Sequence, residues 1–131
     1  MMAPLSLADA TLATERLELR PLRASDADEM AAVLGDPRLH ELTGGQPLPV
    51  AELRLRYQRL ELGTSPDGAE TWLNWIIRLH ATGAAIGTLQ ATVTGLTPSQ
   101  HAQIAWVVGV PWQKQGFASE AAIALVAWLE A

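Results

Sequence analysis

The sequence predicts an α/β (α+β) domain whose elements follow the order β-α-α-β-β-β-α. Residues 16–20 alternate between charged and leucine side chains, as a half-buried strand does. Two apolar stretches, 72–80 and 85–94, flank the turn Ala81-Thr82-Gly83 and predict a β-hairpin. Residues 117–129 are apolar nearly all round, which predicts a helix that needs cover on more than one side.

The first half of the chain predicts two helices after the opening strand. Ser25 is expected to cap the first helix, because its hydroxyl can accept hydrogen bonds from the free N–H groups of an acidic first turn. Gly35, followed by Asp36-Pro37, ends that helix. Residues 50–62 predict the second helix, and its apolar face carries Leu53, Tyr57 and Leu60.

The second half predicts three strands and a last helix. The hairpin is followed by a strand over residues 102–108. Pro111 has no N–H and cannot continue a paired central strand, so the ladder is expected to open there. The final helix is expected to start near Gly116. One face of the first hairpin strand carries Leu73, Trp75, Ile77 and Leu79.

Length and composition bound the class of protein. The 131 residues suffice for one domain with a single core, and the net charge of -5 argues against nucleic acid as a partner. No apolar run reaches the ~18 residues of a membrane helix, and the N-terminus lacks the pattern of a signal peptide. The absence of cysteine fits a cytoplasmic location, which we expect. Histidines and carboxylates show no metal-ligand spacing.

The most informative stretch is the junction over residues 107–120. An apolar strand runs into a glycine-bearing loop, and the loop runs directly into the apolar helix. Such a junction points free backbone N–H groups at one spot and can hold a phosphate without strong positive charge. The alternative is an ordinary strand-to-helix turn whose glycine only eases packing.

Several stretches together resemble a known family. Residues 113–118 match the pattern Gln/Arg-x-x-Gly-x-Gly/Ala, and residues 15–22 and 83–89 match two flanking motifs. With the element order, they resemble the GCN5-related N-acetyltransferase (GNAT) superfamily, in its ribosomal-protein alanine acetyltransferase (RimJ/RimL-like) branch. The resemblance covers residues 14–131 as the N-terminal portion of that domain and leaves residues 1–13 as a flexible N-terminus. It implies a mixed, mostly antiparallel sheet with helices on both faces, lacking the C-terminal strands.

The resemblance also implies where a cofactor binds. Backbone N–H groups at the helix start would hold the pyrophosphate of acetyl-CoA, and small residues let that backbone approach closely. Two valines match the positions where a splayed strand pairs with the pantetheine arm. The implied cofactor-binding residues are Val108, Val110, Gln113, Lys114, Gln115, Gly116, Phe117, Ala118 and Ser119.

The catalytic residues stay unassigned. Gln103 occupies the position where some branches of the family carry a glutamate base, and an amide cannot take a proton. Gln103 could orient water, bind substrate or simply face solvent. His101 could act as a base at neutral pH or simply be exposed. Trp106 and Trp112 could line an acceptor pocket or belong to the core. Three arginines could meet an acidic acceptor or face solvent, namely Arg54, Arg56 and Arg59.

The implied activity is transfer of an acetyl group from acetyl-CoA to a primary amine, either a protein N-terminus or a small amine. The alternative is a non-catalytic acyl-CoA-binding or interaction module, inactive through truncation, because neither a base nor the family's later acid is found. An uncovered sheet edge beside an apolar helix favours association. We therefore expect a homo-oligomer, at least a dimer.

Overall fold

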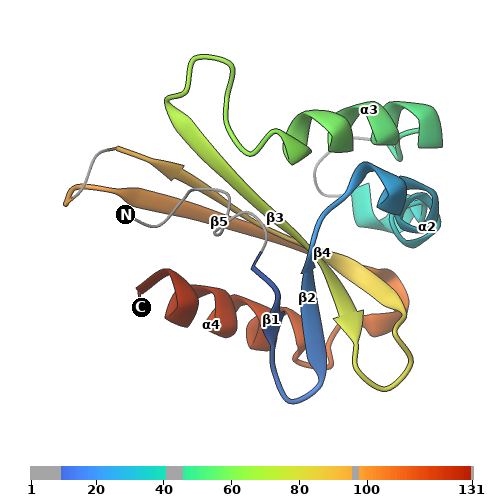
Figure 1. Cartoon of the computed structure of the whole chain (residues 1–131). Coiled ribbons are helices and arrows are strands. Elements are labelled where there is room, and N and C mark those ends of the chain that lie inside the picture. The colour runs from blue at the N-terminus through green and yellow to red at the C-terminus, as the bar shows by residue number, and fades with distance from the viewer. Residues whose placement is uncertain (1–9, 41–45, 96–97, 131) are drawn as a thin grey trace.

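The computed structural model describes residues 10–40, 46–95 and 98–130. Its sheet has five antiparallel strands in the order β1-β2-β3-β4-β5 (Figure 1). The β3–β4 hairpin is the longest pairing, and β5 lies at the edge of the sheet. The strands are β1 (Leu12–Ala13), β2 (Leu17–Pro21), β3 (Glu70–Leu79), β4 (Ala85–Thr94) and β5 (His101–Val108).

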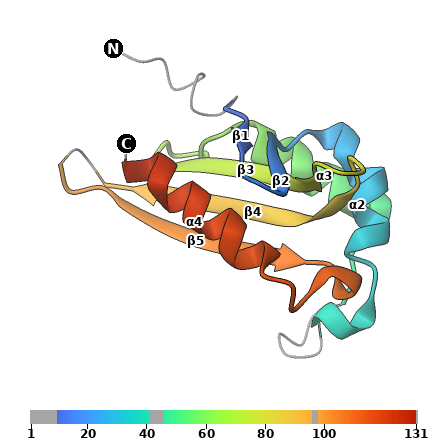
Figure 2. The same ribbon diagram turned by 90° about the horizontal axis from the view of Figure 1, so that it is seen from below.

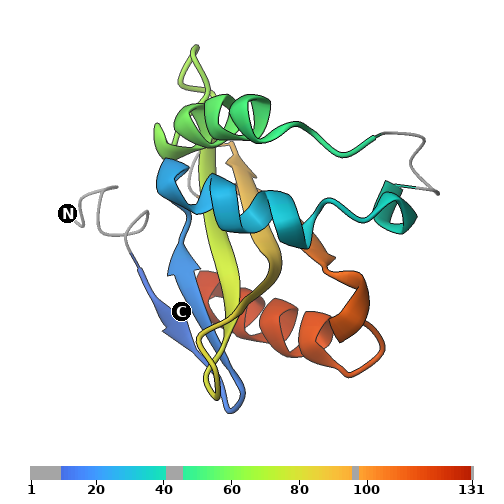
Figure 3. The same ribbon diagram turned by 90° about the vertical axis from the view of Figure 1, so that its right-hand side faces the viewer.

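Helices cover both faces of the sheet. Helices α2 (Ala27–Val33) and α3 (Val50–Glu61) pack on one face, and α4 (Phe117–Glu130) lies across the other (Figures 2 and 3). Short 3-10 turns precede α2, follow it and link β5 to α4. They are η1 (Ala24–Asp26), η2 (Pro37–His40) and η3 (Val110–Trp112).

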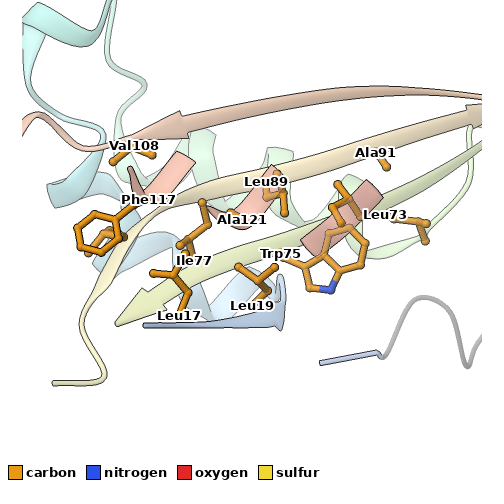
Figure 4. Close-up of a cluster of buried hydrophobic side chains, with 12 residues drawn as sticks. Leu17, Leu19, Leu73, Trp75, Ile77, Leu89, Ala91, Val108, Phe117 and Ala121 are labelled. Carbon is orange, nitrogen blue, oxygen red and sulfur yellow. The ribbon is translucent and has the colours of Figure 1, made fainter. Parts of the chain in front are cut away.

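The core beneath α4 comes from the alternating residues of the strands. Leu73, Trp75 and Ile77 of β3 point to this face, as the hairpin pattern predicted, and meet Ala121 and Leu125 of the helix (Figure 4). The Trp75 ring packs edge-on against Trp128 with centroids 5.5 Å apart, and its Nε1 donates to the Ala10 carbonyl at 2.8 Å. This face therefore also holds the start of the described chain.

A second, smaller core lies under α2 and α3. Met30, Leu53 and Tyr57 of the two helices bury Ile76, which faces the opposite way from its neighbours on β3. Beside it, the Arg78 guanidinium donates to both oxygens of the Glu29 carboxylate at 2.8 and 3.2 Å. These hydrogen bonds lower the pKa of Glu29 and raise that of Arg78. The ion pair fastens α2 to the hairpin.

The predicted order of elements is confirmed. The structure differs from the prediction in one additional strand and in one helix cap. The prediction had no strand before residue 16, whereas Leu12–Ala13 pair with Leu19 and Glu18. The predicted Ser25 cap is wrong: Ser25 lies inside η1, and the Asp26 carboxylate instead accepts a hydrogen bond from the Arg23 N–H at 2.8 Å.

The outer face of α4 is apolar and open. Ile123 is 69% exposed and Val126 41%, whereas Leu125, on the sheet side, is fully buried. The sheet thus covers one side of this helix, whereas its composition predicts cover on more than one side. Within the described ranges, no helix combines the length and apolar character that a membrane span requires.

Candidate functional site

The candidate site begins where β5 stops pairing. Its last rung is the hydrogen bond from the Gly109 N–H to the Ile86 carbonyl at 2.7 Å. Gly109 is buried, and a Cβ there would lie 2.9 Å from the Trp112 ring, so only glycine fits without a shift. The chain then enters η3 through Pro111. The ladder opens at the proline, as predicted.

Two glutamine side chains hold the loop in shape. Gln113 Nε2 donates to the Val108 carbonyl at 3.0 Å, and Gln115 Nε2 donates to the Pro111 carbonyl at 3.1 Å. Each amide therefore satisfies a backbone carbonyl that no strand of the sheet pairs with. The side chains of both glutamines shape the loop, while their backbone remains part of the predicted phosphate site.

The loop leaves a run of backbone N–H groups free. Lys114 and Gly116 have φ angles of 63° and 84°, so the chain turns through the left-handed region twice. Among the described residues, the N–H groups from Lys114 through Ser119 have no hydrogen-bond acceptor. They lie at the positive end of the α4 dipole. Free donors at a helix start are the chemistry of an anion site.

An ion-pair network fixes this loop from the β1–β2 side. Arg16 Nε lies 2.6 Å from Glu120 Oε1, and Arg16 Nη1 donates to the Gln115 carbonyl at 3.0 Å. Thr14 Oγ1 and the Arg16 N–H donate to the other Glu120 oxygen. The guanidinium also stacks 4.3 Å from the centre of the Phe117 ring. We call these five residues the loop clamp.

The clamp sets the charge state of Glu120. Burial by itself raises the pKa of this carboxyl, but the hydrogen bonds from Thr14 and Arg16 outweigh it and lower the pKa below its ordinary value. The carboxylate is therefore ionised at neutral pH. It stands at the first turn of α4, where a negative charge is favourable.

A cleft of about 570 Å³ opens beside the loop. It contains seven of the nine predicted cofactor residues; Val110 and Gln115 do not line it. The sequence prediction missed Arg38, Leu39 and Val107, whereas it gave Trp106 and Trp112 as candidates for an acceptor pocket. Arg38 lines the same cleft as Lys114, but its guanidinium is paired with the Asp36 carboxylate at 2.7 Å. The lining is Arg38, Leu39, Trp106, Val107, Val108, Trp112, Gln113, Lys114, Gly116, Phe117, Ala118 and Ser119.

A second pocket of about 360 Å³ lies on the opposite face of the sheet, under α2 and α3. Val107 of β5 lines both cavities, so they approach each other at this residue. The full lining is Leu22, Ala31, Leu34, Gln46, Leu48, Leu53, Arg56, Tyr57, Leu60, Asn74, Thr88, Gln90 and Val107.

Neither His101, the possible base, nor Gln103, which could orient water or bind substrate, lies at this meeting point. His101 starts β5, six residues from Val107, which is about 20 Å along a strand. Gln103 is exposed and four residues from Val107, about 13 Å away. Neither residue lines either cavity. In the part of the chain that the structure describes, no three histidines or carboxylates gather as metal ligands would.

Comparison with family models matches residues 16–131 to the acetyltransferase (GNAT) domain. Comparison with curated protein sequences gave no significant match.

Solved structures share the fold. An acetyltransferase of the GNAT family from Bacillus anthracis is 18% identical with a TM-score of 0.67; the alignment covers 91% of this chain and 65% of that one. An acetyltransferase from Agrobacterium tumefaciens is 28% identical with a TM-score of 0.61, covering 91% and 66%. Ribosomal-protein-S5-alanine acetyltransferase from Vibrio fischeri is 18% identical with a TM-score of 0.67, covering 92% and 67%. The chain thus spans about two thirds of their length.

Replacing Gly116 with valine tests the loop. The φ angle of 84° is unfavourable for a β-branched residue, and the new Cβ would lie 3.4 Å from Arg16 Nη2. We expect Gly116→Val to weaken coenzyme A binding at least about tenfold, measured by calorimetry, because the N–H groups no longer converge. Gly83→Val is the matched control: its φ is 75° in a distant turn with open space around it. Equal losses in both variants would refute the site.

Replacing Glu120 with glutamine tests the clamp. We expect Glu120→Gln to lower the free energy of unfolding by about 1–2 kcal/mol at neutral pH. Because the folded-state pKa of Glu120 lies below its ordinary 4.5, this stabilisation is present above about pH 4.5 and is lost as the pH falls through the folded-state pKa. Urea titrations of wild type and variant should therefore converge in acid. Glu130→Gln, at the exposed far end of α4, should have no such effect. A Glu120→Gln deficit independent of pH would contradict the account.

Proposed function

The chain belongs to the acetyltransferase (GNAT) domain family, and we propose that it transfers an acetyl group from acetyl-CoA to a primary amine. One observation carries this proposal: a loop with free N–H groups opens onto a cleft, and Val107 lines both this cleft and the second pocket. A cofactor in the cleft and an amine in the pocket would meet at this residue.

The cleft suits the phosphates of acetyl-CoA. The N–H groups at the start of α4 would hold the pyrophosphate, and Lys114 adds positive charge to the same cavity. Arg38 also lines the cavity, but its charge is paired with Asp36. Phe117 is buried against the core, which keeps this end of the helix in place. The fit depends on directed backbone donors more than on net charge, in keeping with an acidic protein.

The open edge of β5 suits the pantetheine arm. Residues of an antiparallel ladder alternate between hydrogen-bonded and non-hydrogen-bonded pairs. Because the Gly109 N–H is hydrogen-bonded to β4, this alternation turns the N–H groups of Trp106 and Val108 away from β4, toward the open edge of the sheet. An extended amide chain can bind such an edge as a further strand. The pocket side of β5 then presents Val107 beside the thioester.

The reaction requires a neutral amine nitrogen to attack the thioester carbonyl carbon. The C–N bond forms, the C–S bond breaks, and the nitrogen loses a proton as coenzyme A leaves as a thiol. A backbone N–H at the β5 edge can polarise the carbonyl oxygen. Tyr57 does not supply the base: burial raises its pKa to about 12, so it stays protonated.

Amine-dependent release of free coenzyme A thiol tests the proposal. We expect acetyl-CoA to yield thiol and an acetylated amine when the chain is supplied with peptide N-termini or small primary amines. Mass spectrometry would identify the product. Binding of acetyl-CoA without an acetylated product across both acceptor classes would contradict transfer and leave the second candidate, a non-catalytic acyl-CoA-binding module. The specific observation favouring that candidate is Gln103, an amide where a carboxylate base stands in some relatives.

We also propose that two copies of the chain associate through the open face beside the cleft. Ile123 and Val126 on α4 are 69% and 41% exposed. Such apolar surface on an open helix face favours association. Sedimentation at micromolar concentration is expected to give a dimer mass, and Ile123→Glu a monomer. Leu55→Glu, on the similarly exposed face of α3, should leave the mass unchanged. A wild-type monomer would overturn this.

A further inference from the structure

The pocket under α2 and α3 has a distinctive charge. Of its described lining residues, Arg56 is the sole charged side chain, and no carboxylate is among them. The neighbouring arginines on α3 behave differently: Arg54 pairs with Asp28 at 2.6 Å, and Arg59 does not line the pocket. Arg56 has no ion pair within the described ranges. Among the described lining residues, a cationic ligand would meet no opposite charge and one like charge. Asp26, the carboxylate that acts electrostatically on the lining Tyr57, does not line the pocket and is paired with Arg78 at 3.4 Å.

The floor of the pocket is polar but neutral. Asn74 and Gln90 are paired directly across the β3–β4 ladder, and Thr88 lies two residues along β4. In the part of the chain that the structure describes, the side chains of these three residues have no hydrogen-bond partner. Neutral donors and acceptors without partners suit a ligand with neutral polar groups.

The walls of the pocket are apolar. Five leucines surround the floor: two belong to α3, and the other three follow β2, follow α2 and precede α3. They are Leu53, Leu60, Leu22, Leu34 and Leu48. Val107 lines the side shared with the cleft. A volume of about 360 Å³ admits a small molecule or one terminal side chain. The surface thus favours a carbon skeleton that loses its contact with water on binding.

From this lining we infer that the acceptor carries its amine on an apolar body that is uncharged or anionic. This inference rests on the proposed function, which makes the pocket the acceptor site. The carbon skeleton packs against the leucines, a neutral polar group meets Asn74 and Gln90, and an anionic group faces Arg56. Amines with further positive charges, such as polyamines, are disfavoured.

Three benzylamines that differ in one substituent test the inference. They are 4-(aminomethyl)benzoate, 4-methylbenzylamine and 1,4-bis(aminomethyl)benzene, whose ring substituents are anionic, neutral and cationic. Their dissociation constants are measured by calorimetry on the full chain with coenzyme A present. We expect the benzoate and the methyl compound to bind at least about fivefold more tightly than the diamine. A diamine that binds as tightly as the benzoate would overturn the inference, and so would the absence of binding by all three.

Reversing the charge of Arg56 on α3 tests whether this side chain causes the preference among the three amines. Arg56→Glu is expected to shift the benzoate-to-diamine preference toward the diamine by about fivefold or more. Arg59→Glu makes the same charge change on the same helix outside the pocket and should leave the preference as in wild type. Equal shifts in the two variants would show a general field effect and overturn the role of Arg56.

Experiments can distinguish a wrong acceptor class from a wrong proposed function. The proposed function fails if the chain forms no acetylated amine from acetyl-CoA. The acceptor inference is read from binding constants, which need no turnover. If acetyl transfer is observed while the diamine is preferred, the function stands and the acceptor class is wrong.

Discussion

The candidate site depends on the point where β5 loses its partner. Pro111 cannot donate to a ladder, and the Gln113 side chain donates to the Val108 carbonyl on the open edge of β5. The chain must then turn within a few residues into α4, and the left-handed Lys114 and Gly116 accomplish this. The free N–H groups of the helix start are a direct result. An anion site therefore follows from how the strand ends rather than from charged side chains.

The two faces of the sheet contribute different parts of the candidate site. The α4 face holds the larger core and the loop clamp, so it fixes the donors that would meet a cofactor. The α2 and α3 face holds a smaller core and a pocket whose polar floor has no side-chain hydrogen-bond partner among the described residues. Val107 belongs to both cavities, because it lies on the edge strand where the cleft and the pocket approach each other. Transfer between two bound molecules requires such a meeting point.

The sequence correctly predicted those features that depend on residues close together in the chain. The β4 bounds at residues 85–94, the start of α4 near Gly116 and the glycine of the loop followed from periodicity and turn chemistry. Contacts between residues far apart in the sequence could not be predicted in this way. The Arg16–Glu120 ion pair joins two segments that share no sequence pattern, and the two residues of β1 are too few to show an alternation. The Ser25 cap failed because an acid one residue later caps the backbone instead. Arg56 was one of three equivalent arginines until the fold placed it at the pocket.

The central claim is that backbone N–H groups at the start of α4 bind the pyrophosphate of the cofactor. Amide nuclear magnetic resonance during titration tests it most directly, with coenzyme A compared with pantetheine, which lacks the pyrophosphate. We predict that coenzyme A shifts the amide signals from Gln115 through Ser119, whereas pantetheine shifts the β5 edge alone. Coenzyme A binding that leaves the loop amides unchanged, or pantetheine moving them equally, would contradict the account.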